Sequence, residues 1–398
     1  MTKAAAQSVS VCLVSNTAWS IFNYRHGLLR ALLAQGATVT VVAPPDRSVE
    51  ALTKMGCAFQ PLAVASKGTN PLRDLRTMWS LYRHYRRIRP DIVFHYTIKP
   101  NIFGTLAAAL ARVPSVAVTT GLGYVFLNAG MAATVAKRLY RLAFRFPREV
   151  WFLNPDDREA FERERLLAHP ARARLLRGEG IDLDYFSPRP TVADALVRPQ
   201  PQPFTFLLIG RLLWDKGVGE YIDAARRLRE QFPHARWQLL GPVGVANPSA
   251  IDQADLDGWL GEGIVDYLGE AADVRPHIAA ADCIVLPSYR EGVPRTLLEA
   301  AAMSKPAIAT RVPGCIEVID AGQTGLLCEA RDASALADAM VTMLRMPVAQ
   351  RAQLGQAARA KAVAEFDQAL VIARYFETVG RLTQYANAAP PDSAADAR

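Results

Sequence analysis

The chain has 398 residues, more than one ordinary domain, so two domains of about 150–200 residues each are expected. Hydrophobic residues make up 51% and charged residues 21%, a composition that excludes a disordered or fibrous protein. The net charge of +8 is concentrated in residues 1–190, with 26 Lys and Arg against 13 Asp and Glu, which favours an anionic partner and leaves both nucleic acid and a membrane open.

Short apolar runs alternate with helix-sized spacers in both halves of the chain. The runs predict strands at residues 9–14, 38–43, 92–95, 116–119 and 150–153, and again at 204–209, 237–240, 264–268, 283–286 and 307–310. Five prolines between residues 188 and 203 separate the two series, because no helix or central strand tolerates that density. Such alternation predicts doubly wound parallel sheets, whose ligands lie at the carboxyl ends of the strands.

The sequence therefore predicts an α/β chain of two Rossmann-like domains that face each other across a cleft. The first domain is expected at residues 1–190 and the second at residues 191–363. A final helix at 364–385 carries the aromatic residues Phe366, Tyr375 and Phe376 and should cover a sheet face, with packing back toward the first domain as one option. The small and polar segment 386–398 is expected to be disordered.

A glycine-containing turn follows the strand at 204–209. It reads Gly210-Arg211-Leu212-Leu213-Trp214-Asp215-Lys216-Gly217 and leads into a helix. Glycines at such a turn let a ligand approach the backbone, and Arg211 and Lys216 supply cations for a diphosphate. A tight turn with a solvated charged loop would have the same sequence, so this motif alone leaves both interpretations open.

A second turn follows the strand at 283–286 and reads Pro287-Ser288-Tyr289-Arg290-Glu291-Gly292-Val293-Pro294-Arg295-Thr296-Leu297-Leu298-Glu299. Pro294 suits the first turn of a helix, where its missing N–H costs nothing. The free amides at that helix start would face Glu291, which predicts an anion site beside a carboxylate. Two surface carboxylates on a core helix are the alternative.

In this order and spacing, the two turns resemble the retaining family-four glycosyltransferases of the GT-B fold, as do the later segments Pro313-Gly314-Cys315 and Gly325-Leu326-Leu327. The N-terminal half resembles a narrower group, the bacterial enzymes that build surface glycans on polyprenyl-diphosphate carriers. That group includes the N-acetylgalactosaminyltransferase acting on lipid-linked bacillosamine. The segments that carry this likeness are 20–25, 95–104 and 119–124.

The resemblance implies a role for each matching residue of the second domain, which would bind a nucleotide-sugar. Arg211 and Lys216 would bind the donor diphosphate and stabilise charge on the leaving nucleotide. Glu291 would contact the donor sugar and Glu299 the ribose. The donor would also be bound by the turn and the helix start, at Gly210, Gly292, Val293, Pro294, Arg295 and Thr296.

The first domain would hold the acceptor, and here the chain departs from the broad family. Many members have a Gly-Gly turn after the first strand, where this chain has Asn16-Thr17-Ala18, and a histidine near residues 120–123, where it has Thr120-Gly121-Leu122-Gly123. His95 could supply that catalytic function, although a lone histidine at a strand end is more often structural. The candidate acceptor or cleft residues are Asn16, Asn23, Arg25, Lys99, Gly121 and Tyr124.

Two further patterns resemble cofactor and metal motifs. The segment 121–126 half-matches a dinucleotide fingerprint but lacks its third glycine and the later acidic residue, so neither NAD nor another cofactor is expected. Asp182-Leu183-Asp184 and Asp255-Leu256-Asp257 are DxD triplets away from the phosphate motifs, so no metal is expected. The five cysteines form no CxxC pair and are odd in number, which argues for a reducing compartment.

The sequence predicts a retaining, metal-independent hexosyltransferase of bacterial surface polysaccharide biosynthesis. It would move a hexose, an N-acetylhexosamine or a uronic acid, from a UDP-sugar to an acceptor. The acceptor would be a polyprenyl-diphosphate-linked saccharide or a lipopolysaccharide core, as in O-antigen assembly. A UDP-sugar 2-epimerase of the same architecture is the alternative and a non-catalytic sugar-nucleotide scaffold is a third; Arg211, Lys216 and Glu291 argue against both.

Two basic stretches indicate where the first domain could meet a membrane. Lys137, Arg141 and Arg145 recur every four residues on one helical face, and six arginines interleave with aromatic residues between 73 and 89. We expect these faces to rest on the anionic inner leaflet, although solvated faces of core helices would look the same. No nucleic-acid recognition motif, secretory leader or run of 18 apolar residues is found, so a cytoplasmic enzyme peripheral to the plasma membrane is expected.

Overall fold

The computed structural model describes residues 8–63, 71–121, 131–188 and 203–383, and the chain divides into two compact units. Unit 1 comprises Met1–Glu179 and Gln368–Arg398, and unit 2 comprises Gly180–Asp367. The chain thus passes between units at 179/180 and 367/368, where the sequence suggested 190/191 and 363/364. Among the described residues, no helix is both long and apolar enough to cross a membrane.

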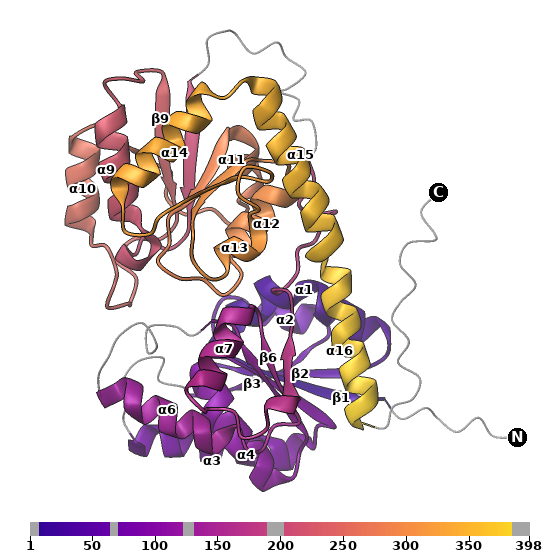
Figure 1. Ribbon diagram of the computed structural model, residues 1–398. Helices are drawn as coiled ribbons and strands as arrows, with labels where there is room; N and C mark the ends of the chain where they lie inside the picture. The colour runs from indigo at the N-terminus through magenta and orange to yellow at the C-terminus, as the bar shows by residue number, and fades with distance from the viewer. Residues whose placement is uncertain (1–7, 64–70, 122–130, 189–202, 384–398) are drawn as a thin grey trace, which may run out of the picture. The chain divides into compact units, whose positions relative to one another are not determined.

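Unit 1 is built on a parallel sheet in the order β3-β2-β1-β4-β5-β6-β7 (Figure 1). Its strands are β1 (Ser10–Val14), β2 (Thr38–Ala43), β3 (Ala58–Pro61), β4 (Ile92–Tyr96), β5 (Ser115–Thr119), β6 (Glu149–Phe152) and β7 (Ala173–Leu175). Every residue of β4 and β5 is buried, as expected for central strands of a parallel sheet that helices cover on both faces.

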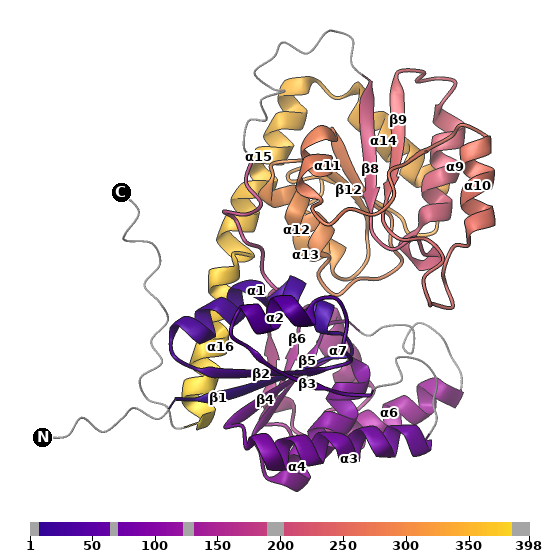
Figure 2. The same cartoon turned by 180° about the vertical axis from the view of Figure 1, so that it is seen from behind.

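The helices of unit 1 lie on both faces of this sheet (Figures 1 and 2). One face carries α1 (Ala18–Ala34), α2 (Val49–Lys54) and α16 (Gln368–Thr383); the other carries α3 (Pro71–Ile88), the π-helical turn η1 (Pro100–Gly104), α4 (Thr105–Ala111) and α6 (Met131–Ala143). The unit also contains α7 (Pro155–Arg163) and the short η2 (Pro170–Arg172). Both α3 and α6 pack against η1, so they belong to the same layer.

Aromatic side chains hold α16 on the sheet of unit 1. The ring of Tyr375 lies 4.8 Å, centroid to centroid, from both Phe94 of β4 and Trp151 of β6. Its hydroxyl lies 2.9 Å from that of Tyr96, so the buried polar ends satisfy each other. The last helix therefore covers a sheet face, as its aromatic pattern predicts.

His95 lies inside unit 1 and makes structural contacts. Its side chain is fully buried, with Nε2 2.8 Å from the Tyr85 hydroxyl and Nδ1 3.3 Å from Thr105 Oγ1. A Cβ on Gly104 would come within 2.5 Å of the ring, so glycine is what lets η1 pass over it. A ring enclosed in this way cannot reach a substrate, and we therefore leave His95 out of the proposed catalytic residues, contrary to the expectation from the sequence.

The burial of His95 should make the stability of unit 1 depend on pH. Burial lowers the pKa of His95 from 6.5 to about 3. As the pH falls below 6.5, His95 becomes protonated in the unfolded chain but stays neutral in the folded chain. The free energy of unfolding therefore decreases until the pH reaches about 3. Relative to a His95→Gln variant, the wild type should lose about 2 kcal/mol of unfolding free energy between pH 6.5 and 5. Urea titrations at both pH values measure this; a pH-independent difference would mean that the imidazole titrates normally.

Unit 2 is built on a parallel sheet in the order β10-β9-β8-β11-β12-β13. Its strands are β8 (Phe204–Ile209), β9 (Ala235–Leu240), β10 (Asp266–Tyr267), β11 (Cys283–Leu286), β12 (Ala307–Thr310) and β13 (Leu326–Cys328). Its helices are η3 (Trp214–Lys216), α9 (Val218–Leu228), α10 (Gln253–Gly261), α11 (Arg275–Ala280), α12 (Arg295–Ala302), α13 (Cys315–Val318), α14 (Ala333–Arg345) and α15 (Val348–Glu365).

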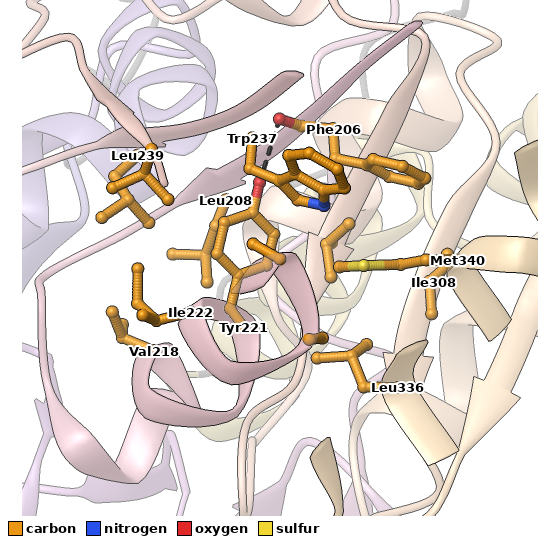
Figure 3. Close-up of a cluster of buried hydrophobic side chains, with 14 of the residues drawn as sticks. Phe206, Leu208, Val218, Tyr221, Ile222, Trp237, Leu239, Ile308, Leu336 and Met340 are labelled. Carbon is orange, nitrogen blue, oxygen red and sulfur yellow. Dashed lines mark hydrogen bonds between the residues drawn. The ribbon is translucent and has the colours of Figure 1, made fainter. Parts of the chain in front are cut away.

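The core of unit 2 joins β8 and β9 to α9 and α14 (Figure 3). Phe206 and Trp237 come from the sheet, whereas Tyr221 and Met340 come from the helices, and all four are buried. The Tyr221 hydroxyl donates to the carbonyl of Phe206 at 3.0 Å, so this tyrosine enters the core without an unpaired polar atom. The packing fixes α9 directly after the turn that begins at Gly210.

Candidate functional site

Three loops of unit 2 meet at the carboxyl ends of the neighbouring strands β8, β11 and β12. Gly217 has φ +70°, and a Cβ there would lie 2.1 Å from the carbonyl oxygen of Pro287. Gly314 has φ +84°, and a Cβ there would lie 2.5 Å from the carbonyl oxygen of Gly292. Both positions therefore need glycine twice over, for the backbone conformation and for the close approach. The two turns predicted from the sequence are thus in direct contact.

Substituting Gly217 should test how tightly these loops must fit. A Gly217→Ala change should cost about 1–2 kcal/mol for the left-handed backbone, and the clash with Pro287 should add a further 1–3 kcal/mol, about the usual cost of overpacking. Gly269→Ala is the matched control, because Gly269 has φ +73° with nothing within 4 Å of its Cβ position. Thermal unfolding of both variants measures the difference. Equal destabilisation would contradict the close contact between the two loops.

Opposite charges from two of these loops form an ion pair. Lys216 Nζ donates to Glu291 Oε1, and the two side chains remain 24% and 12% exposed. An ammonium group has three donors, so Lys216 keeps further N–H groups for another anion. Arg211, in the same loop as Lys216, is exposed, whereas the backbone N–H of Gly210 donates to Leu240 of β9 at 2.9 Å.

The start of α12 lies at the same end of the sheet. The helix begins at Arg295, and its N-cap residue, Pro294, makes no side-chain capping hydrogen bond. Thr296 Oγ1 donates to the carbonyl of Ile209 at 3.3 Å, which anchors the helix start at the end of β8. The positive end of a helix, with the cations of Lys216 and Arg211 on a loop at the same end of the sheet, is suited to binding a phosphate group.

Glu299 lies one turn along α12, where Arg295 holds it. Arg295 Nε donates to Glu299 Oε1 at 3.4 Å. Burial raises the pKa of the Glu299 carboxyl above its ordinary value, while the charge of Arg295 opposes that rise. A carboxylate that is mostly covered but held by one arginine can accept hydrogen bonds from neutral hydroxyl groups, as the predicted ribose contact requires.

Sequence reasoning missed a residue that fixes the second loop. The Tyr289 backbone N–H donates to the carbonyl of Asp215 at 2.9 Å, and its hydroxyl donates to Glu220 Oε1 at 2.7 Å. The guanidinium of Arg331 lies 4.5 Å from the Tyr289 ring centroid. These partners are far away in sequence, so no local pattern signals them. Gly314, by contrast, stood within the Pro313-Gly314-Cys315 segment that carries the family resemblance.

In unit 1 three of the candidate acceptor residues follow neighbouring strands. Asn16, Lys99 and Gly121 come shortly after β1, β4 and β5, so they lie at the carboxyl end of the sheet. Lys99 Nζ donates to Asp74 Oδ1 at 2.8 Å. Thr97, at the same end of the sheet, has φ +71°. This is a strained conformation for a β-branched residue, and no sequence pattern predicts it. Tyr124 lies outside the described residues.

Two other candidates are placed differently by the structure. Asn23 is exposed on α1, and its side-chain amide donates to the carbonyl of Trp19 at 3.0 Å. Arg25 is buried, forms an ion pair with Glu179 and lies 3.6 Å over the ring centroid of Tyr96. These contacts satisfy the Arg25 charge inside unit 1, so we assign it a structural role in place of the acceptor role suggested by the sequence.

The predicted membrane-facing residues also make contacts within unit 1. Lys137 Nζ donates to Glu164 Oε1 at 2.7 Å, and Arg141 donates to the carbonyls of Glu164 and Arg165, both at 3.0 Å. Arg145 is exposed. Although the three cations are regularly spaced, Lys137 and Arg141 are therefore already engaged within unit 1.

Within the described ranges, no three His, Cys, Asp or Glu side chains gather as a metal site would require. Asp182 Oδ1 accepts the backbone N–H groups of Asp184 and Tyr185, at 3.1 and 2.9 Å. Asp257 accepts a hydrogen bond from Gln253 at 2.8 Å, on a helix that Asp252 caps. Both DxD triplets thus make local hydrogen bonds.

Two family models match the chain, one in each unit. The model described as "Glycosyl transferase 4-like" matches residues 10–154, and the model "Glycosyl transferases group 1" matches residues 203–346. The second range includes all three loops described above for unit 2.

Similar curated proteins are bacterial glycosyltransferases. The N,N'-diacetylbacillosaminyl-diphospho-undecaprenol alpha-1,3-N-acetylgalactosaminyltransferase of Campylobacter jejuni is 27% identical over 93% of this chain and 98% of its own length. The UDP-Gal:alpha-D-GlcNAc-diphosphoundecaprenol alpha-1,3-galactosyltransferase of Escherichia coli is 26% identical over 68% of this chain and 70% of its own. These matches give no support to the epimerase alternative.

Solved structures share the fold at lower sequence identity. HepE of Anabaena in complex with UDP-glucose superposes with a TM-score of 0.77, at 20% identity over 94% of this chain and 99% of that one. A sucrose-phosphate synthase from Thermosynechococcus elongatus gives a TM-score of 0.78, at 22% identity over 95% and 100% of the two chains. Glycosyltransferase models match both units, and a known glycosyltransferase is similar along nearly the whole length. This chain therefore belongs to the glycosyltransferases. It has their GT-B fold of two α/β units, each built on its own parallel sheet.

Proposed function

We propose that the chain is a retaining, metal-independent glycosyltransferase that moves a hexose from a UDP-sugar to a lipid-linked saccharide acceptor. The hexose would be an N-acetylhexosamine or a uronic acid. One observation carries the proposal: Arg211, the Lys216–Glu291 pair and the start of α12 lie at one end of the sheet in unit 2. The names of the two bacterial relatives support an undecaprenyl-diphosphate acceptor, and that of the Escherichia coli relative also supports a UDP-sugar donor.

In this proposal the donor diphosphate binds between Arg211, Lys216 and the first-turn amides of α12. The bond between the sugar C1 and the diphosphate oxygen breaks, and the electron pair stays on UDP. The two cations and the helix end are already in place when this charge develops. They stabilise it without reorganisation and so lower the barrier. Glu291 faces the sugar, where its negative charge stabilises a C1 that has become cationic.

The acceptor hydroxyl then bonds to C1 on the face that UDP leaves, and its proton passes to the departing phosphate oxygen. This route requires no metal, because Arg211 and Lys216 supply the positive charge. For the acceptor we propose the strand ends of unit 1, with Asn16, Lys99 and Gly121. The enzyme would work at the inner face of the plasma membrane, where a lipid-linked acceptor meets a nucleotide-sugar.

A panel of UDP-sugars tests this proposal. Each radiolabelled donor is incubated with the protein and a membrane extract of the host, and the lipid fraction is scored for the transferred sugar. We expect one N-acetylhexosamine or uronic acid to transfer, with the rate unchanged by EDTA. Activity that EDTA abolishes and a divalent ion restores would contradict metal independence, and no transfer from any donor would contradict the proposed reaction.

A further inference from the structure

One face of α3 exposes large apolar side chains to solvent. Leu72 is 70% exposed, and Leu75 and Trp79 are each 56% exposed, although the helix packs on the sheet through Thr77, Leu81 and Tyr85. Positions 72, 75 and 79 are three and four residues apart, so their side chains form one stripe along the helix. An exposed apolar stripe that is bordered by charged residues is typical of a surface that contacts a protein partner or a membrane.

Arginines border the stripe on the same face. Arg76, Arg83 and Arg87 line, together with Leu72, Leu75 and Trp79, an open groove of about 550 Å³. The helix carries five arginines and a single acidic residue, Asp74, whose carboxylate is paired with Lys99. Within the part of the chain that the structure describes, no ion pair is recorded for Arg76 or Arg83, and Arg87 bonds to the neutral Gln60. The positive charge of this face is therefore not neutralised.

The neighbouring helix α6 repeats this combination. Val135, Leu142 and the following Phe146 are exposed, as are Arg138 and Arg145. The buried side of α6 is formed by other residues, Tyr140 and Ala143. Basic and apolar residues therefore share the exposed face of this helix. Since α3 and α6 both pack on η1, the two faces belong to one layer of unit 1.

We propose that these faces of α3 and α6 form a docking surface for an anionic lipid bilayer. Leucine, valine and tryptophan side chains can enter the boundary between headgroups and acyl chains, while arginines stay at the level of the lipid phosphates. A nucleic acid would meet the arginines equally well but offers no apolar phase for Leu72, Leu75 and Val135. The proposal deepens the proposed function and rests on it in one respect, since docking would bring unit 1 to a lipid-linked acceptor.

Vesicle flotation tests the surface without any need for sugar transfer. The wild type should float with vesicles that contain phosphatidylglycerol and should bind vesicles of phosphatidylcholine alone much more weakly. An Arg76→Glu/Arg83→Glu variant should bind the anionic vesicles at least about 30-fold more weakly, because each basic residue near such a surface contributes about a five-fold factor. A Leu75→Ser/Trp79→Ser variant should also lose binding. Circular dichroism checks that both variants, which change only exposed positions, stay folded.

The matched control is an Arg236→Glu/Arg345→Glu variant, which makes the same change in net charge at exposed positions of unit 2. It should float like the wild type. Failure of the wild type to bind anionic vesicles, or equal loss in the control, would overturn the proposal. So would an arginine variant that loses affinity for an oligonucleotide but not for vesicles, or a wild-type dimer that the Trp79→Ser change dissociates.

Fluorescence quenching locates the contact directly. Vesicles with brominated acyl chains should quench the tryptophan emission of the wild type, and the quenching should fall in a Trp79→Phe variant that still floats. Unchanged quenching would show that Trp79 stays in water. Transfer to a short-chain, water-soluble acceptor should be the same in wild type and arginine variant, whereas transfer to a vesicle-borne acceptor should fall. Absence of transfer to either acceptor would count against the proposed function and leave the flotation result standing.

Discussion

Replacement of Lys216 or Arg211 with alanine is expected to lower kcat by at least about 100-fold, with the fold intact. Each variant removes a fixed cation from the loop where we place the leaving diphosphate, and a charge-assisted contact that strengthens as UDP departs is worth roughly 3 kcal/mol. Arg211 is exposed and Lys216 is partly exposed, so neither substitution opens a cavity in the core. Steady-state kinetics with saturating donor and acceptor measure the effect.

Lys361→Ala is the control for the lysine variant. Lys361 also forms an ion pair in unit 2, with Asp320 at 2.7 Å, but it lies on α15 and outside the three loops. Its substitution should leave kcat within about two-fold of the wild type. Near-wild-type turnover in both Lys216→Ala and Arg211→Ala would refute the diphosphate assignment.

A Glu291→Gln substitution should lower kcat far more than Glu299→Gln does, by at least about 100-fold at saturating donor. Glutamine keeps the shape of the side chain and removes the negative charge that we place against the sugar. Glu299 lies on α12 and is paired with Arg295, where it is expected to hold the ribose equally in ground and transition states. Its amide variant should therefore raise the donor KM by about ten-fold with little change in kcat.

These two variants control each other, because both remove one carboxylate charge from the same site of unit 2. The comparison of kcat with KM separates the two roles, and a general loss of stability would move both parameters in both variants. An inactive Glu299→Gln enzyme beside an active Glu291→Gln enzyme would show that the two roles are reversed.

Much of the fold could be predicted from the sequence, because central strands of a parallel sheet are continuous apolar runs. All ten predicted strands are present, with bounds shifted by a few residues at most. The structure adds β3, β7 and β13, which are three of the four edge strands of the two sheets. Edge strands are half exposed and short, as in Ala58–Pro61, so they lack the apolar run on which the prediction rests.

The sequence predicts the site residues that directly follow strands. It gives no sign of residues whose positions depend on contacts that are distant in sequence. The turns at Gly210 and Pro287 were found because each begins where an apolar strand ends. The sequence does not reveal the burial of His95 and Arg25, since a polar residue at a strand end or within a helix has the same sequence signature whether it faces solvent or the core. Their partners, Tyr85 and Glu179, come from other elements that only the tertiary structure brings near.

Acceptor-dependent release of UDP tests the central claim most directly. A purified lipid-linked saccharide acceptor is added to the protein with the UDP-sugar that transfers best, and UDP is followed together with the anomeric configuration of the product by NMR. The account predicts that UDP appears only with acceptor, in equal amount to a product that keeps the donor's α configuration. Conversion of the UDP-sugar without acceptor, or a product with inverted configuration, would contradict it.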